Sequence, residues 1–339
     1  MVSFMNRHQV ALYLLALAGG VVASFVPGVA TLAQPLITPA LSFLLLVTFL
    51  SLPLRGLLVP KQAPGLTAAL VLLNFLVVPL ITAALVLVLA VLVPELPDLL
   101  LFTAALVLLA PCIDYVVAFA AAAGGASDRL LARTPLLLLT QCVLVPVWIL
   151  IFNRAGVWNR ELLASRALWN SLPEVGLALA VVVVPLALAA VVQGIGPKVR
   201  SVTARLAEAV MVPAMLPVLF LTPAAHAAHL THWALHILPL ASIYTVFAIL
   251  MWGLSRLLLP RYGSCLSTAE QTAATFSAVT RNALVVLPIV LGLSAAMGGT
   301  AGASLMPLAV LTQTLVELLI LTLMVAVYRN QLSAPSSPR

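Results

Sequence analysis

Hydrophobic residues run in long uninterrupted blocks along this chain, and short polar segments that carry most of the charges separate the blocks. Each block is about as long as the roughly 20 residues that an α-helix needs to cross a bilayer. Apolar and polar residues do not alternate within the blocks, as they would in the strands of a membrane barrel. The pattern therefore predicts an all-α polytopic membrane protein with ten transmembrane helices. The predicted spans, numbered one to ten in chain order, are 10–27, 35–52, 66–93, 99–124, 134–153, 173–193, 207–223, 234–258, 268–296 and 303–327.

The composition and the placement of charge support the same class of protein. Hydrophobic residues make up 63% of the 339 residues and charged residues only 7%, against roughly 25% charged residues in a soluble domain. The net charge of +7 does not indicate a nucleic-acid partner, because ten spans place twelve of the sixteen Lys and Arg residues on one side of the bilayer. Lys and Arg are enriched on the cytoplasmic side. We therefore expect a multi-pass protein of the cell (plasma or inner) membrane with both termini cytoplasmic.

The sequence lacks the motifs that mark common enzymes and metal sites. It has no Gly-rich phosphate loop followed by Lys, no HExxH and no GxSxG. Its three cysteines have neither CxxC nor disulfide-framework spacing. The histidines of the stretch 226–236 recur at helical spacing and could bind zinc, but an interfacial amphipathic segment is the preferred interpretation. We expect no enzymatic activity, no cofactor and no resident metal.

An internal match relates two parts of the chain. The segments 135–145 and 307–317 align at an offset of 172 residues, and they belong to spans five and ten. Because five spans is an odd number, a second copy enters the membrane from the opposite side, which is typical of secondary transporters built from inverted repeats. The identical positions are Pro135/Pro307, Leu136/Leu308, Leu139/Leu311, Thr140/Thr312 and Gln141/Gln313.

This match predicts how the chain is organised. Residues 1–153 would form the first five-helix repeat, 154–172 an external connecting loop, and 173–328 the second, inverted repeat. The polar, Pro/Ser-rich residues 329–339 would form a disordered cytoplasmic tail.

Spans four and nine, which correspond in the two repeats, are both interrupted by polar residues near their centres. Span four reads Ala-Pro-Cys-Ile-Asp at 110–114, and span nine reads Thr-Arg-Asn at 280–282. Proline removes a helix hydrogen bond, and irregular backbone at membrane depth is tolerated only where it lines a cavity or is buried in protein. Two interrupted spans in corresponding positions therefore predict discontinuous helices that cross at a midplane binding site.

Three charged residues lie at or near this predicted site. Asp114 and Arg281 would be the opposite charges near mid-membrane, either as a substrate- or proton-responsive pair or as a structural salt bridge. Glu317 follows Gln313 by four residues and so shares its helix face. Its carboxylate could carry a coupling proton or bind a cation, or it could be a hydrogen-bonded packing residue.

Several uncharged residues are further candidates. Cys112 could bind a thiophilic substrate as a thiolate, or it could be a small buried hydrophobe. The remaining polar side chains could line the pocket or hold neighbouring helices together. They are Asn74, Thr140, Gln141, Asn282, Thr312 and Gln313.

Three local motifs resemble those of the arsenite carriers within the bile acid/sodium symporter superfamily. These are "NFLVVPL" at 74–80, "APCIDYVV" at 110–117 and "TLVELLILTLM" at 314–324. The resemblance implies a ten-helix fold with a core around crossed spans four and nine and a panel formed by spans one, two, six and seven. It implies proton-driven export of arsenite or antimonite, with the signature cysteine at Cys112 and the family's glutamate at Glu317.

One position departs from the family pattern. The family's ninth helix carries a carboxylate shortly after its Asn, whereas this chain reads Arg281-Asn282-Ala-Leu-Val without an acid. A positive charge at this point disfavours a sodium site, so the expected coupling ion is the proton. The expected function is proton-coupled efflux of arsenite, antimonite or a similar small oxyanion. The alternatives are a carrier in which Arg281 grips an organic anion, and a membrane sensor or assembly component without transport.

Overall fold

The computed structural model describes residues 8–53, 64–110, 116–158, 172–227, 230–298 and 302–333. These residues form helices joined by short turns, without a strand among them, so the prediction of an all-helical membrane protein is confirmed. By length and composition, seven helical segments among them can cross a bilayer: Val29–Ser51, Pro64–Leu92, Thr134–Ala155, Pro197–His226, His236–Gly263, Thr268–Ala296 and Ala303–Gln331. Three shorter apolar helices, Gln9–Ser24, Asp98–Leu108 and Leu179–Ile195, overlap the other three predicted spans.

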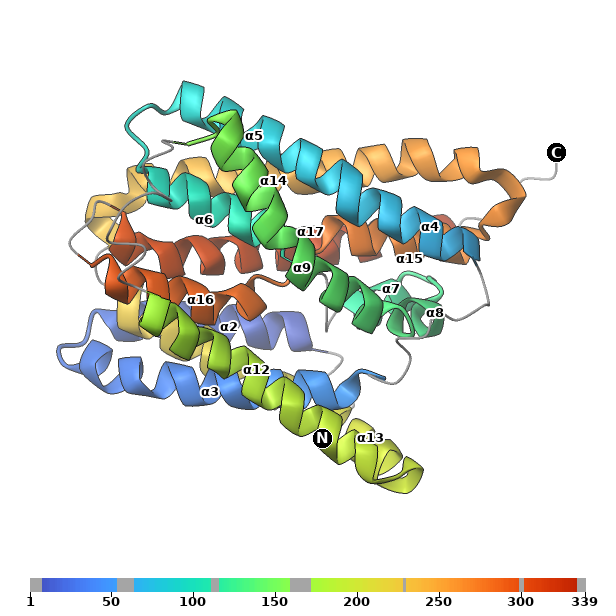
Figure 1. Ribbon diagram of the computed structural model, residues 1–339, viewed down its shortest axis with the longest axis horizontal. Coiled ribbons are helices and arrows are strands. Elements are labelled where there is room, and N and C mark those ends of the chain that lie inside the picture. The colour runs from blue at the N-terminus through green and yellow to red at the C-terminus, as the bar shows by residue number, and fades with distance from the viewer. Residues whose placement is uncertain are drawn as a thin grey trace.

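Four helices pack together as a panel along one side of the molecule (Figure 1, lower edge). Helix α13 packs along both α2 and α3, and α12 packs along α3. Close approach between α2 and α13 requires Gly20, since a Cβ atom there would lie 2.2 Å from the carbonyl oxygen of Phe220. Small residues permit such close contact between membrane helices. The panel helices are α2 (Gln9–Ser24), α3 (Val29–Ser51), α12 (Leu172–Ile195) and α13 (Pro197–His226).

The end of α3 is capped by a side chain from α12. The amide nitrogen of Gln193 donates hydrogen bonds of 2.9 Å to the carbonyl oxygens of both Phe49 and Leu52. The last carbonyls of a helix have no partner within the helix, so this buried amide satisfies groups that hydrocarbon would leave unpaired. The same contact fixes α12 against α3 within the panel.

The remaining helices form a core above the panel in Figure 1. Within the core, α5 packs on α6, α14 packs on α15, and α17 contacts α6, α14 and α16. The core meets the panel where α12 packs on α16 and where α13 packs on α17. The core elements are α4 (Pro64–Leu72), η2 (Leu73–Val77), α5 (Val78–Leu92), α6 (Asp98–Leu108), α7 (Val116–Ala122), α8 (Ser127–Leu131), α9 (Thr134–Ala155), α14 (Leu230–Leu258), η4 (Leu259–Cys265), α15 (Thr268–Val279), α16 (Ala283–Ala296), η5 (Ala303–Leu305) and α17 (Met306–Ser333).

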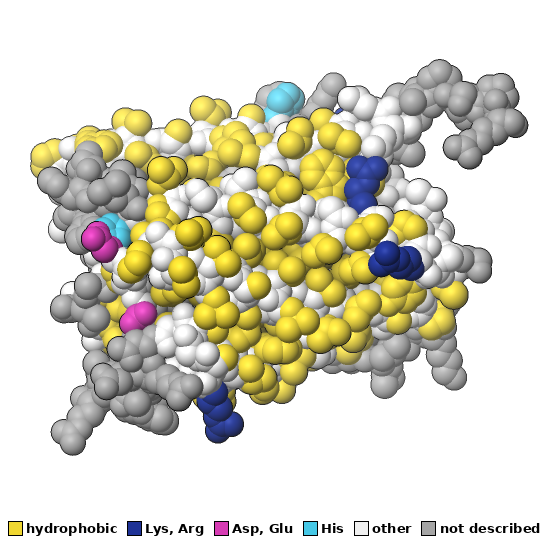
Figure 2. Space-filling view, turned by 90° about the horizontal axis from the view of Figure 1, so that it is seen from above, with side chains coloured by type: hydrophobic (Ala, Val, Ile, Leu, Met, Phe, Trp, Pro, Cys, Tyr) yellow, Lys and Arg dark blue, Asp and Glu magenta, His cyan; other side chains and the backbone are white. Residues whose placement is uncertain are grey.

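The distribution of side chains is that of a protein surrounded by lipid. Hydrophobic side chains cover most of the face drawn in Figure 2, and the charged side chains on it are sparse and lie toward its edges. Large apolar residues such as Leu32 and Val91 are 72% and 75% exposed. Conversely, Arg281 and Glu317 are 0% and 2% exposed. Apolar exposure on this scale is tolerated by a bilayer and not by water.

Both predicted interruptions coincide with ends of helices. Helix α6 ends at Leu108 and α7 begins at Val116, with residues 111–115 outside the described part of the chain. Helix α15 ends at Val279 and α16 begins at Ala283, and Thr280 between them has an extended backbone.

Three predicted boundaries are wrong. Helix α3 begins at Val29, six residues before the predicted start at 35. Helix α17 continues to Ser333, so the first residues of the predicted disordered tail are helical. Helix α13 begins at Pro197 and not at 207. Proline is favoured in the first turn of a helix, and no Gly or Pro follows it until Pro213, so the basic residues between 198 and 205 belong to the helix. The predicted external loop 154–172 falls mainly on residues 159–171, outside the described residues.

Replacing Gly20 tests the packing of the panel. Gly20→Ala should lower the thermal midpoint of the purified protein, because its Cβ would overlap the backbone of α13 and overpacking typically costs about 1–3 kcal/mol. The matched control is Gly19→Ala, whose Cβ would lie 3.5 Å from the Phe220 ring in ordinary contact. Equal thermal midpoints for the two variants would contradict this packing.

Candidate functional site

The candidate site lies where the ends of α6 and α15 meet. We call it the crossing and define it as the non-helical residues that follow these helices: Leu109 and Ala110 after α6, and Thr280, Arg281 and Asn282 between α15 and α16. All five are buried. Backbone groups that leave a helix in such surroundings need other hydrogen-bond partners.

Arg281 joins the two helix ends. Its Nη2 donates to the carbonyl oxygen of Ala278 at 2.7 Å, and its Nη1 donates to the carbonyl oxygen of Ala110 at 3.4 Å. The guanidinium carbon also lies 5.8 Å from the centroid of the Phe247 ring, within cation–π range. A single side chain therefore contacts two parts of the backbone that are 171 residues apart in the sequence.

Helix α17 supports the same backbone from the opposite side. The amide N–H of Arg281 donates to Oε2 of Glu317 at 2.9 Å. The Gln313 side-chain amide donates both to the carbonyl oxygen of Arg281, at 3.2 Å, and to Oε2 of Glu317. The prediction that Gln313 and Glu317 share one helix face is confirmed, and that face is turned toward the crossing.

The glutamine that corresponds to Gln313 in the first half of the chain makes an equivalent bond. The side-chain amide of Gln141 in α9 donates to the carbonyl oxygen of Leu109 at 2.6 Å. Gln141 follows its acceptor by 32 residues, as Gln313 follows Arg281. Both donor and acceptor are displaced by the 172 residues that separate the matched segments. The same residue type therefore satisfies a freed carbonyl at the same position of each broken helix.

Asn282 acts as the N-cap of α16. Its Oδ1 accepts hydrogen bonds from the backbone N–H groups of Leu284 at 3.1 Å and Val285 at 3.3 Å. The first N–H groups of a helix lack partners within the helix, and Asn is a preferred cap. Asn282 is 1% exposed, so the cap supplies partners that water cannot.

Asn74 connects span three to the end of α15. It lies in the π-helical turn η2, and its Nδ2 donates to the carbonyl oxygen of Leu70 at 2.9 Å and to Ser277 Oγ at 3.3 Å. Its Oδ1 is buried and has no partner within the described residues. Such π-helical turns are frequent at functional sites. This one places the Asn74 side chain against Ser277, which precedes the crossing residue Thr280 by three positions.

The remaining predicted site residues either do not contact the crossing through their hydroxyls or lie outside the described residues. Thr140 and Thr312 are half-buried, and Thr312 Oγ1 donates to the Leu308 carbonyl of its own helix. Within the described residues neither hydroxyl is hydrogen-bonded to the crossing. Cys112 and Asp114 lie in 111–115, outside the described residues, directly after Ala110.

A small cavity adjoins Glu317. Its volume is about 10 Å³, and its lining includes Tyr244, Phe247, Gln313 and Glu317, which leaves room for about one water molecule. The Tyr244 hydroxyl and Gln313 Oε1 are buried without partners in the described part of the structure. Nothing in the sequence marks Tyr244, because an aromatic residue in an apolar helix has the pattern of a packing residue.

A larger apolar cleft lies between the panel and the core. Its volume is about 240 Å³, and it is lined by α3, α12 and α16, with Thr38, Val181, Pro288 and Leu291 among the lining residues. The cleft therefore sits on the helix that follows the crossing.

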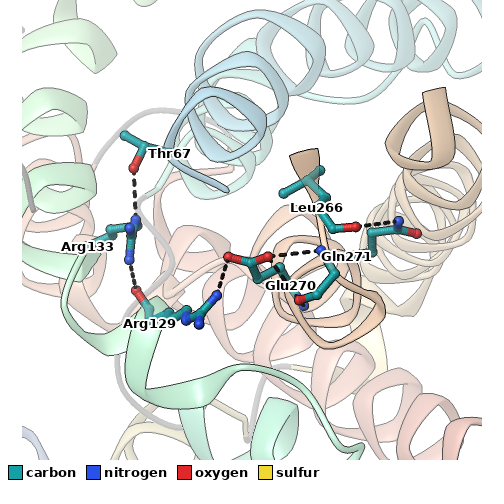
Figure 3. A network of polar contacts seen from close by, with 7 residues as sticks. Thr67, Arg129, Arg133, Leu266, Glu270 and Gln271 are labelled. Carbon is teal, nitrogen blue, oxygen red and sulfur yellow. Dashed lines mark hydrogen bonds and ion pairs between the residues drawn. The ribbon is translucent and has the colours of Figure 1, made fainter. Parts of the chain in front are cut away.

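A polar network fixes the start of α15 (Figure 3). Arg129 Nη1 lies 2.8 Å from Glu270 Oε1, and Glu270 forms a capping box with Ser267. Arg133 donates to Thr67 Oγ1 at 2.8 Å and to the Arg129 carbonyl at 2.6 Å. These bonds join α4, α8 and α15, so the broken helix is anchored at its outer end as well as at the crossing. The charge placement alone does not reveal the Arg129–Glu270 pair, which is 141 residues apart in the sequence.

Neither a metal-binding cluster nor a similar known protein identifies the role of these residues. Within the described residues, no group of three His, Cys, Asp or Glu side chains could hold a metal ion, and the histidine-rich stretch is only partly described. No protein-family model matches the chain, and a search of curated proteins found no match.

The two equivalent glutamines provide a test of the crossing. Gln141→Leu and Gln313→Leu should each lower the thermal midpoint. Gln141→Leu removes the donor to the buried Leu109 carbonyl, at a cost of about 1–3 kcal/mol for an unsatisfied group. Gln313→Leu removes one donor to the Arg281 carbonyl, which also accepts from the Ala283 N–H at 2.9 Å. Gln313→Leu should have the larger effect, since Gln313 also donates to Glu317. Gln331→Leu, at an exposed position near the end of α17, is the control. A loss of stability in only one of the two buried variants would contradict the equivalence.

Proposed function

We propose that this protein is a proton-coupled secondary transporter that exports arsenite, antimonite or a similar small oxyanion. The observation that carries the proposal is the buried charge at the crossing, where Arg281 and Glu317 brace irregular backbone inside an apolar bundle. On insertion scales a charged residue at the membrane centre costs about 2.5–3.5 kcal/mol. Such residues are retained where they serve a substrate or ion pathway.

The two glutamines support a fold of two inverted five-helix repeats with ten transmembrane helices. In such transporters, discontinuous helices in corresponding positions form the binding site near the midplane, at the interface of the repeats. Helices α6 and α15 end in corresponding positions, and Gln141 and Gln313 satisfy corresponding carbonyls beyond those ends. The matched segments of the sequence thus coincide with matched chemistry at the crossing.

The division into panel and core suits alternating access. Helices α3 and α12 of the panel contact α16 of the core, and α2 and α13 contact α17. The apolar cleft opens where α3 and α12 meet α16. Rigid-body rocking of one bundle against the other around a fixed site is the usual mechanism in transporters with inverted repeats. Movement of the panel along α16 and α17 would expose the crossing first to one side of the membrane and then to the other.

Glu317 is the proposed coupling residue among those described. Its carboxylate accepts hydrogen bonds from the Arg281 N–H and the Gln313 amide. Protonation would weaken these bonds and loosen the support that α17 gives to the crossing. The adjoining cavity has room for a water that would pass the proton beside Tyr244.

Cys112 and Asp114 complete the proposed substrate site. They follow Ala110, whose carbonyl oxygen accepts a hydrogen bond from Arg281. A thiolate is a strong ligand for a thiophilic element such as trivalent arsenic, which gives Cys112 the role that the family resemblance implies. Asp114 would contribute to substrate binding and to proton transfer beside the fixed positive charge of Arg281.

The apolar cleft favours a second candidate, the transport of an organic anion. A cleft of about 240 Å³ with mainly apolar lining at the interface between panel and core suits the hydrocarbon part of such a molecule. Its carboxylate or sulfonate would then interact with Arg281.

Arsenite flux tests the first candidate. Everted membrane vesicles with an imposed proton gradient should accumulate arsenite, and Cys112→Ser should abolish accumulation if the thiolate is a ligand. Glu317→Gln should reduce gradient-driven accumulation by at least about tenfold, equivalent to 1.4 kcal/mol. The control is Cys142→Ser, because Cys142 is an exposed free thiol on α9.

Two outcomes would contradict the assignment of substrate. Arsenite accumulation that is unchanged by Cys112→Ser would exclude thiolate recognition. Binding of an organic anion to the purified protein that is lost in Arg281→Ala and unaffected by Cys112→Ser would favour the second candidate.

A further inference from the structure

The guanidinium of Arg281 occupies a position between two helix C-termini. Helices α6 and α15 end at Leu108 and Val279, so the carbonyls of their last turns point away from the helices without helical partners. Arg281 donates to one carbonyl at each end, Ala110 beyond α6 and Ala278 in the last turn of α15. It does so with no exposure to solvent.

The electrostatics of this position are those of a monovalent-cation site. A helix C-terminus carries roughly half a negative charge, so the ends of α6 and α15 both attract a cation placed between them. In transporters with broken helices, unwound carbonyls and half-helix C-termini bind coupling cations. The face of Phe247, 5.8 Å from the guanidinium carbon, adds a further attraction for a cation.

We propose that the crossing is a monovalent-cation site whose permanent occupant is the Arg281 guanidinium, so the broken helices are held together without a free ion. The inference goes beyond the proposed function, because it concerns what stabilises the crossing and not what is transported. It predicts that the folded protein does not depend on sodium or potassium. It also predicts that removal of the side chain opens a site that a small guanidinium ion can fill.

The geometry explains why arginine is suited to this position. Its guanidinium is a planar fork with donors in fixed directions, whereas a lysine ammonium is a compact point charge. The bonds to Ala278 and Ala110 use different terminal nitrogens of the fork. Arg281→Lys should therefore keep the positive charge but lose one of the two hydrogen bonds to the Ala278 and Ala110 carbonyls.

Thermal unfolding of the full-length protein in lipid nanodiscs is the test. Arg281→Ala should have a lower thermal midpoint than the wild type in choline chloride. Millimolar methylguanidinium at equal ionic strength should restore most of this loss, and sodium should restore less because it lacks directed donors. The wild-type midpoint should be the same in all these salts.

Three controls test whether rescue depends on the charge of methylguanidinium, on its planar shape, or on a general effect of the salt on stability. Urea is planar and neutral, so it should not restore the stability of Arg281→Ala. Arg256→Ala removes a cation 5.8 Å from the Tyr328 ring, outside the crossing, and methylguanidinium should not change its midpoint. Arg281→Lys should be intermediate in stability and insensitive to methylguanidinium, because its own charge fills the site.

Several results would overturn the inference. They are an Arg281→Ala variant as stable as the wild type, equal rescue by urea, or failure to recover folded Arg281→Ala in methylguanidinium while Arg281→Lys folds. Since unfolding requires no substrate, the test is separate from the flux assay. If methylguanidinium restores the stability of Arg281→Ala but the wild type moves no arsenite, the cation site stands and the proposed function fails. If the wild type moves arsenite but methylguanidinium restores nothing, the proposed function stands and the cation site fails.

Discussion

Backbone groups that leave a helix inside an apolar bundle must be hydrogen-bonded, and the arrangement of the crossing depends on this constraint. Water is absent from hydrocarbon, and each unsatisfied group there costs several kcal/mol. The protein meets the constraint with side chains: Gln141 and Gln313 for two freed carbonyls, Asn282 for the first amides of α16, and Glu317 for the amide of Arg281. Arg281 itself serves two further carbonyls. Two of the residues that support the break, Arg281 and Glu317, therefore also bring charge into the buried interior.

The two halves of the chain share this support but differ in charge. The glutamines correspond at an offset of 172 residues, whereas the positions that correspond to Arg281 and Glu317 are Leu109 and Val145. Both halves thus hydrogen-bond a freed carbonyl with a glutamine. The two charged side chains described at the crossing, Arg281 and Glu317, belong to the second half. If the two halves are inverted repeats, as proposed, each broken helix needs the hydrogen bonding, whereas one proposed substrate site needs the charge only once.

The sequence alone predicted the helices, the two interruptions and the shared face of Gln313 and Glu317, because each depends on residues close together in the chain. It did not predict the contacts of Tyr244, the Arg129–Glu270 pair or the capping role of Asn282. The first two join segments far apart in the sequence, and hydrophobic periodicity contains no information about which helices become neighbours. Asn282 was assigned to the pocket from the sequence because it is a polar residue within a span. In the structure its side chain instead caps the N-terminus of the helix that follows it.

In the proposed transporter, a permanent cation at the crossing would limit the choice of coupling ion. Arg281 keeps its charge because an arginine guanidinium is not deprotonated in proteins, and its bonds to two carbonyls leave it buried among fixed dipoles. The charge at this point can then change through a neighbouring group that gains or loses a proton. Among the described residues Glu317 is bonded to the crossing, and its protonation would alter the support of the Arg281 backbone directly. For the proposed transporter, a fixed guanidinium with a carboxylate bonded to the backbone amide of the same residue would therefore favour the proton over sodium as the coupling ion.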